Sequence, residues 1–235
     1  MIDKNPNNID NNFTEAELRR SALDFTSVRL QVYRLLAALF QDAPSVDMLQ
    51  QLVQVAQAQM ENAVDTASPE AKFYAYMAGL DMKDPEATRR DIASEYGELF
   101  VGPRPPLAPL YESIYIGFPN RLFTDQTLKV RSAYERNGLT VVKSRKVPDD
   151  HIGYEFEFMA EMVARQIEAL NDDNEANIKA LEAEQRKFLA DHLALWTGKF
   201  AARIHENYGE GFYSALAVFA DDFVMNDLEY LMETR

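Results

Sequence analysis

Apolar side chains recur every three to four positions along most of this chain, which is the period of an amphipathic helix. Thr14 and Glu17 form a Thr-x-x-Glu pair, the pattern of a capping box that begins a helix. Phe13 and Leu18 stand where a hydrophobic staple closes over such a first turn. A first helix is therefore expected from about residue 14, with its apolar repeat at Val28, Val32, Leu35, Leu36 and Leu39.

Further helix starts are marked by capping residues, often with proline in the first turn, where its missing N–H costs nothing. A polar break at residues 171–174 and the glycines at 209 and 211 separate the later helices from one another. Residues 139–142 are expected to form an extended loop, because no partner strand is apparent. The predicted starts are Ser45, Ser68-Pro69, Asp84-Pro85, Thr124 and Pro148-Asp149-Asp150, and two later apolar stripes cover residues 188–200 and 212–232.

These elements predict an all-α fold, a single helical domain of about eight to nine helices over residues 13–235. The Asn-rich residues 1–12 are expected to be a disordered tail. They do not resemble a secretory signal, because no apolar run follows a basic start. Five of the ten prolines fall within residues 95–119, so a proline-rich central crossover, with a possible hinge at residues 102–120, is expected to divide the helices.

Composition narrows the functional classes. The chain is 47% hydrophobic, which is enough for a sizeable core, and the longest apolar run is too short to cross a membrane. The absence of cysteine excludes disulfides, thiolate metal sites and Cys nucleophiles. The net charge of −14 disfavours nucleic acid and anionic membranes and suits a basic partner or simple solubility. The expected compartment is the cytoplasm, with no stable membrane insertion.

Sequence motifs for catalysis are missing: the chain has no phosphate-binding loop, no HExxH and no GxSxG. His151 and Glu155 are one helical turn apart and form a possible metal pair, but further ligands are lacking, so a local hydrogen bond by His151 is favoured. Asp149 and Asp150 suit either helix capping or an anionic hook for a basic peptide, with Asp150 as the exposed member.

Two other sets of polar residues favour structural roles. His192 shares an apolar stripe with Trp196 and is expected to be a hydrogen-bonded core histidine. Glu155, Glu157 and Glu161 are close enough in sequence to resemble an acid–base pair, but on an acidic helix they are expected to form a solvated face. No catalytic residue and no metal site is therefore predicted.

Three stretches together resemble the TorD/DmsD/NarJ family of redox-enzyme maturation chaperones. They are Glu95-Tyr96-x-x-Leu99-Phe100-x-Gly102-Pro103, Pro148-Asp149-Asp150-His151-Ile152-Gly153-x-Glu155-x-x-Phe158-Met159 and Phe188-Leu189-x-x-His192-Leu193-x-x-Trp196-x-x-x-Phe200, with Arg29-x-x-x-Tyr33-x-x-Leu36 as an earlier, similar stretch.

The resemblance implies an all-helical, non-enzymatic chaperone of the cytoplasm. Such a protein binds the precursor of a molybdopterin-containing oxidoreductase, often by its twin-arginine signal, assists cofactor insertion and prevents premature export. It also implies weak guanine-nucleotide binding and either a monomer or a domain-swapped homodimer, with no resident cofactor. A helical metal-binding enzyme and a nucleotide-sensing adaptor are the alternatives.

The resemblance also assigns client contacts, and the composition fits them, because a basic and then apolar signal needs carboxylates beside a hydrophobic groove. The proline-rich segment would be a stiffened wall of that groove or a hinge for domain exchange; a plain surface crossover is the alternative. Arg104, Tyr111 and Gly198 depart from other branches and favour the TorD-like one. The predicted signal-peptide contacts are Tyr33, Leu99, Phe100, Gly102, Pro103, Tyr111, Asp150 and His151.

Overall fold

The computed structural model describes residues 14–62, 66–117, 121–142 and 147–234, and the predicted tail at residues 1–12 lies outside them. The described residues fold into helices, which confirms the all-α prediction. They are α1 (Glu15–Gln41), α2 (Val46–Asn62), α3 (Pro69–Ala78), α4 (Pro85–Tyr96), the π-helical turn η1 (Gly97–Val101), α5 (Glu112–Tyr115), α6 (Asp125–Arg136), α7 (Ile152–Asn171), α8 (Glu175–Phe188), the π-helical turn η2 (Leu189–Leu193), α9 (Ala194–Tyr208) and α10 (Phe212–Glu233).

The starts of α1, α3 and α4 follow the caps that the sequence predicts, whereas α7 is capped by His151 rather than by Asp149 or Asp150. Glu17 N–H donates to Thr14 Oγ1 at 3.2 Å while Thr14 N–H donates to Glu17 Oε2 at 2.8 Å, so the capping box is confirmed. Ser68 and Asp84 cap α3 and α4, each followed by proline at the first helical position. Phe13 of the predicted staple lies outside the described residues, and Leu18 is more than half exposed.

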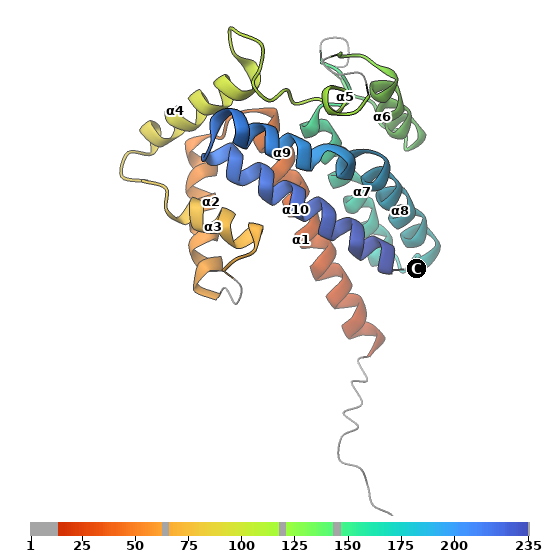
Figure 1. Cartoon of the computed structure of the whole chain (residues 1–235). Coiled ribbons are helices and arrows are strands. Elements are labelled where there is room, and N and C mark those ends of the chain that lie inside the picture. Colours follow the sequence, from red (N-terminus) through yellow and green to blue (C-terminus); the bar gives the residue numbers. More distant parts are fainter. Residues whose placement is uncertain (1–13, 63–65, 118–120, 143–146, 235) are drawn as a thin grey trace, which may run out of the picture.

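Long helices in the middle of the molecule position the rest (Figure 1). α1 and α7 pack along each other, α9 and α10 form a second pair, and α2, α3 and α4 gather at one end of the molecule. α5 and α6 lie at the opposite end, close to α7 (Figure 1). Large apolar side chains from nearly all of these helices, including Phe40, Phe156, Phe200 and Trp196, form one continuous core.

Arg29 is a charged residue in that core, and its partners explain the early motif. Its guanidinium donates to Asp227 Oδ1 at 2.5 Å and to Gln185 Oε1 at 2.6 Å, and Tyr33 Oη donates to Asp227 Oδ2 at 2.5 Å. A buried charge is tolerated only when it is paired and hydrogen-bonded. The Arg29-x-x-x-Tyr33 spacing therefore serves to fasten α1 to α10.

The proline-rich crossover leaves η1 at Gly102 and runs to α5. Its backbone is held by Leu99 O, which accepts from Ala108 N–H at 2.9 Å, and by Leu110 O, which accepts from Ile152 N–H at 2.9 Å. Tyr111 and His151 form an isolated antiparallel bridge. This part of the crossover is therefore fixed to the start of α7, and the wall or hinge role of residues 102–120 stays a prediction, with residues 118–120 outside the description.

Candidate functional site

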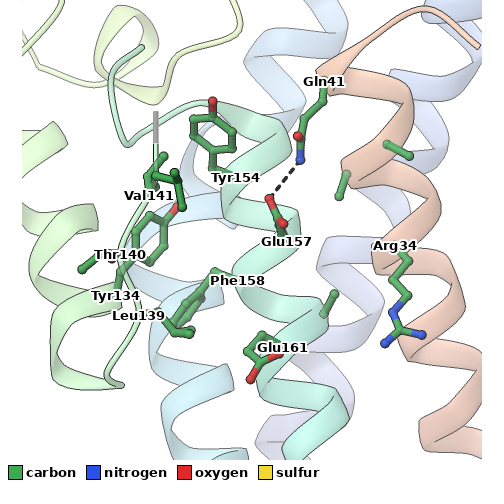
Figure 2. Close-up of a pocket in the computed structure, with 14 residues that line it drawn as sticks. Arg34, Gln41, Tyr134, Leu139, Thr140, Val141, Tyr154, Glu157, Phe158 and Glu161 are labelled. Carbon is green, nitrogen blue, oxygen red and sulfur yellow. Dashed lines mark hydrogen bonds between the residues drawn. The ribbon is translucent and has the colours of Figure 1, made fainter. Parts of the chain in front are cut away.

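A groove of about 700 Å³ follows the surface of α7 and is called the α1/α7 groove below. Figure 2 shows α7 as its floor, α1 on one side and residues 139–142 on the other. Residues 139–142 have no regular secondary structure, as the sequence predicts, and Val142 is 99% exposed. The side chains used below are Tyr154, Glu157, Phe158 and Glu161 on the floor, Arg34 and Gln41 on α1, and Leu139 and Val141 opposite.

Two carboxylates stand over an apolar surface in this groove. Glu157 and Glu161 are four residues apart on α7 and therefore share one face of the helix. Gln41 Nε2 donates to Glu157 Oε2 at 3.1 Å, and Arg165 Nε donates to Glu161 Oε1 at 2.9 Å. Leu139 and Val141, both partly exposed, supply apolar surface beside them, next to the buried ring of Phe158. This combination suits a ligand that presents cationic and apolar groups next to each other.

The predicted residues Tyr111 and His151 lie near one end of the groove. The His151 ring centroid is 5.4 Å from that of Tyr111 and 5.1 Å from that of Tyr154, which lines the groove. At the same end, Gly153 approaches α1 closely: a Cβ there would lie 2.5 Å from Gln41 Cγ. The start of α7 therefore connects two predicted contacts to the groove.

His151 itself is the N-cap of α7, so the predicted local hydrogen bond is confirmed. Its Nδ1 accepts from Gly153 N–H at 3.1 Å, which leaves this nitrogen acting as an acceptor. Burial lowers the pKa of His151 to about 4, because charging the ring would cost it its solvation. The residue is a neutral cap at neutral pH.

Three of the predicted contacts are core residues in this structure. Leu99 is fully buried and Phe100 is 6% exposed, where it stacks on Phe200. Tyr33 is fully buried against Asp227. Leu99 and Phe100 therefore turn into the core and do not line a groove, and the hollow opens beside α7 instead.

The expectation that Asp150 is exposed is wrong. Asp150 is fully buried, and its Oδ2 accepts from Ser113 N–H at 2.8 Å, which ties α5 to the start of α7. Asp149 is buried as well and pairs with Arg131, whose Nε donates to Asp149 Oδ2 at 2.6 Å. Both carboxylates serve the backbone and α6, which is why neither one faces solvent.

The Gly102-Pro103 pair forms the end of η1. Gly102 has a φ of +40°, a conformation that costs a residue with a Cβ free energy, and its N–H donates to Gly97 O at 2.6 Å. Pro103 follows at the surface. The pair shapes the departure of the crossover from the helix, and the structure places it away from the residues that line the α1/α7 groove.

A buried polar cluster lies where the second and third sequence motifs meet. Gln126 Nε2 donates to Glu112 Oε1 at 2.7 Å, His192 Nδ1 lies 3.0 Å from Glu112 Oε2, and Trp196 Nε1 donates to Glu155 Oε2 at 3.3 Å. The prediction that His192 is a hydrogen-bonded core residue is confirmed. The prediction that Glu155 belongs to a solvated face is wrong, since this side chain is fully buried.

Several groove residues were not predicted as contacts. Glu157 and Glu161 were expected only to be solvated, and Arg34, Gln41 and Tyr154 carried no assignment. One signal was available: the unpaired apolar stretch 139–142 leaves a side of α7 uncovered, and Glu157 and Glu161 alternate with Tyr154 and Phe158 at helical spacing. The inward turn of the crossover, which moves the hollow to α7, has no such local signal.

The described residues offer neither a metal site nor a membrane span. No cluster of three or more His, Asp or Glu side chains in that part of the chain has a geometry that could hold a metal ion. None of the helices described combines the length and the apolar character that crossing a membrane requires.

Comparisons with known proteins agree with the motifs. A family model described as "Nitrate reductase delta subunit" matches residues 46–202. The chaperone protein TorD of Shewanella oneidensis is 26% identical over 224 residues, which cover 91% of this chain and 95% of that protein. TorD of Vibrio atlanticus is 25% identical, covering 62% of this chain and 66% of the relative. A perchlorate reductase assembly chaperone of Dechloromonas aromatica is 30% identical, covering 54% and 55%.

Proposed function

The chain belongs to the nitrate reductase delta subunit family, and we propose that within this family it is a system-specific chaperone for the maturation of a molybdenum-containing oxidoreductase. Its relatives include TorD chaperones and a perchlorate reductase assembly chaperone, so the role is that of an assembly factor rather than an enzyme. Its client is the precursor of such a reductase, held in the cytoplasm while the cofactor is inserted.

We further propose that the client's twin-arginine signal binds in the α1/α7 groove. Such a signal is basic at its start and apolar after it. Glu157 and Glu161 supply carboxylates for the arginines, and Leu139 and Val141 supply apolar surface for the following segment. The observation that carries this assignment is the position of both carboxylates over apolar side chains in one hollow. Arginine forms its strongest pairs with carboxylates of this kind.

Two further points of the family resemblance are proposals. Guanine-nucleotide binding is expected to be weak, because the sequence has no phosphate-binding loop. Both a monomer and a domain-swapped dimer are compatible with a crossover that joins the two parts of the chain.

The test is a titration of the purified protein with a fluorescein-labelled twin-arginine signal peptide, followed by anisotropy. Glu157→Gln combined with Glu161→Gln is expected to weaken binding about tenfold, since each lost ion pair is worth roughly 0.7 kcal/mol at a partly exposed site. The matched control is Glu206→Gln with Glu229→Gln, which removes two exposed carboxylates from α9 and α10.

The signal assignment fails if the groove variant and the control variant bind equally well. A second measurement then separates it from the chaperone role: capture of a reductase precursor from the native cytoplasm by the tagged wild-type protein, identified by mass spectrometry. If the groove variant captures the precursor as well, the chaperone role is retained and the signal binds outside the α1/α7 groove.

A further inference from the structure

A second hollow, of about 780 Å³, lies between α6 and the junction of α8 with η2. Lys129, Ser132 and Arg136 line it from α6, at helical spacing on the side of that helix away from Tyr134. Tyr134 lines the α1/α7 groove, so α6 separates the two hollows. We call the second one the α6/α8 hollow.

The α6/α8 hollow is locally basic in a strongly acidic protein. Lys129, Arg136 and Lys187 line it and are exposed, and Asp191 is the only carboxylate among its lining residues, paired with Lys187 at 2.5 Å. On α6 itself, Lys129, Arg131 and Arg136 stand against Asp125 and Glu135, and Arg131 pairs with Asp149, so Lys129 and Arg136 are the α6 cations that line the hollow. Three exposed cations with one carboxylate in a single hollow of a chain of net charge −14 favour an anionic partner at that place.

Apolar side chains are exposed in and beside the same hollow. Leu128 is 53% exposed and Leu195 is 44% exposed, and both line it. Just before α6, Phe123 is 61% exposed and holds a φ of 57°, which is uncommon for an aromatic residue. Exposed apolar residues gathered in one place mark interaction sites more often than scattered ones do.

We propose that the α6/α8 hollow docks an acidic, amphipathic segment of a partner polypeptide, whose carboxylates meet Lys129, Arg136 and Lys187 while its apolar side chains cover Leu128 and Leu195. The mixture of cations and leucines fits a helix or extended segment with one acidic and one apolar edge. The occupant rests on the proposed chaperone function, which supplies a client polypeptide as the partner.

Two other anionic partners fit the hollow less well. A phosphate group is usually held by a set of backbone N–H groups or a helix N-terminus, whereas the cations here are flexible side chains along α6 and at the end of α8. An anionic membrane is an extended surface and would also meet the acidic remainder of the molecule. A short acidic segment feels mainly the charges within about 8 Å, the screening length at physiological salt.

The position of the α6/α8 hollow would allow one client chain to bind at two sites. One client chain whose basic signal lies in the α1/α7 groove needs only to pass α6 for a following acidic segment to reach the α6/α8 hollow. Two linked contacts bind more tightly than either alone, because the second becomes intramolecular. The two hollows, of opposite charge preference, would hold the signal and a part of the mature client together.

The experiment uses the whole chain and a labelled amphipathic peptide of four Glu and four Leu residues, with a peptide in which Gln replaces every Glu as its neutral counterpart. Anisotropy at 0.1 M salt is expected to give at least tenfold tighter binding of the Glu peptide. The triple variant Lys129→Glu, Arg136→Glu and Lys187→Glu is expected to lose this preference. Lys72→Glu, Lys83→Glu and Arg90→Glu, three exposed cations elsewhere, form a control of equal net charge and are expected to keep it.

Equal binding of the two peptides, or equal loss in the hollow and control variants, would overturn the proposal. Displacement of the Glu peptide by millimolar inorganic phosphate at constant ionic strength would also overturn it, in favour of a phosphate site. If the triple variant does not fold by circular dichroism, Lys129→Gln with Arg136→Gln replaces it, with a smaller expected loss of about threefold.

The twin-arginine signal peptide is titrated in parallel with the same variants. The hollow variants are expected to bind the signal peptide at least as tightly as the wild type does, because its site lies on the other side of α6 and the replaced cations only repel it. If the wild type does not bind the signal peptide but does prefer the Glu peptide, the proposed signal site is overturned and the α6/α8 hollow stands. The two failures are therefore distinguishable.

Discussion

The buried carboxyl groups of Glu155 and Glu112 interact inside the molecule, and protonation of Glu155 removes the repulsion between them. Among the described residues, Glu155 Oε1 has no hydrogen-bond donor. Burial, together with the nearby carboxylates of Glu112 and Asp150, raises the pKa of Glu155 well above its ordinary value. A protonated Glu155 carries no charge against Glu112, whose Oε1 accepts from Gln126 Nε2 and whose Oε2 lies 3.0 Å from His192 Nδ1.

Replacing Glu155 by Gln is expected to remove a pH-dependent loss of stability. Because the pKa of Glu155 is higher in the folded than in the unfolded state, folding retains a proton, and stability falls as pH rises from about 4.5 through the folded pKa. In urea unfolding from pH 4.5 to 8, the free energy of unfolding of Glu155→Gln is expected to rise relative to that of the wild type by up to about 1.4 kcal/mol per pH unit. The control is Glu157→Gln, because Glu157 is exposed on the same helix. If the free energy of unfolding of Glu155→Gln depends on pH as that of the wild type does, Glu155 is not protonated in the folded state.

Through His151, at the start of α7, stability is expected to depend on pH in the opposite direction. Its folded pKa, about 4, lies below the ordinary 6.5, so its contribution is present above pH 6.5 and is lost as pH falls toward 4. The full loss is roughly 3 kcal/mol. Asn caps helices without titrating, so His151→Asn is expected to stay folded and to lose less stability between pH 6.5 and 4 than the wild type.

The measurement for His151 is thermal or urea unfolding at half-unit pH steps, with His205→Asn as control because His205 is an exposed histidine on α9. The wild type and the His205 variant are expected to follow the same curve. If His151→Asn follows it too, His151 is not the group that titrates in this range, and the acid sensitivity belongs to the carboxylates.

At the scale of elements, the motif around Glu95 connects two helices that are distant in sequence. Glu95 is buried in α4, and its carboxylate accepts from Phe212 N–H at 3.1 Å and from Tyr213 N–H at 2.7 Å. These N–H groups begin α10 and have no partner within the helix. Gly211 permits the approach, because a Cβ there would lie 2.6 Å from Glu95 Oε1.

Glu95→Ala is therefore expected to destabilise the protein by about 2 kcal/mol, the usual cost of removing a helix cap together with its buried acceptor. Chemical denaturation followed by far-ultraviolet circular dichroism measures this loss. Glu98→Ala, three residues later and exposed, is expected to change the free energy of unfolding by less than about 0.5 kcal/mol. A smaller effect for Glu95 than for Glu98 would contradict the capping role.

The sequence was sufficient for elements whose cause is local. Thr14, Ser68 and Asp84 cap helices because their side chains reach N–H groups two or three residues ahead, and that geometry is readable from spacing. The inward turn of Leu99 and Phe100 has a tertiary cause, since it depends on Phe40 and Phe200 from other helices. The same limit applies to Asp150, whose burial depends on α5 lying across the start of α7.

In the folded structure, polar residues of the family motifs form hydrogen bonds inside the molecule. Glu95, Glu155, His192 and Trp196 are polar residues of the three motifs, and each is hydrogen-bonded inside the molecule. Their spacing specifies how the helices are fastened, so it identifies the fold. The proposed client-binding surfaces consist instead of residues such as Glu157, Glu161 and Lys129, which are not among the motif residues.

At the scale of the whole molecule, charge is unevenly divided. The chain carries −14 overall, yet residues 121–146 around α6 are basic. A basic signal peptide is attracted by the net field from a distance, and the α6 region repels it locally. Long-range attraction acts on the association rate more than on the dissociation rate, and salt screens it. The field should therefore guide the basic end of a signal toward the acidic side of the groove.

We expect the association rate of the twin-arginine signal peptide to fall about tenfold between 20 mM and 300 mM salt, while its dissociation rate changes much less. Stopped-flow anisotropy with the labelled peptide measures both rates. A peptide with glutamine in place of both arginines is the control and should show a nearly flat association rate. A signal peptide whose association is equally insensitive to salt would mean that apolar contacts with Leu139 and Val141, rather than the −14 net charge, decide the encounter. The carboxylates of the groove would then act only after binding.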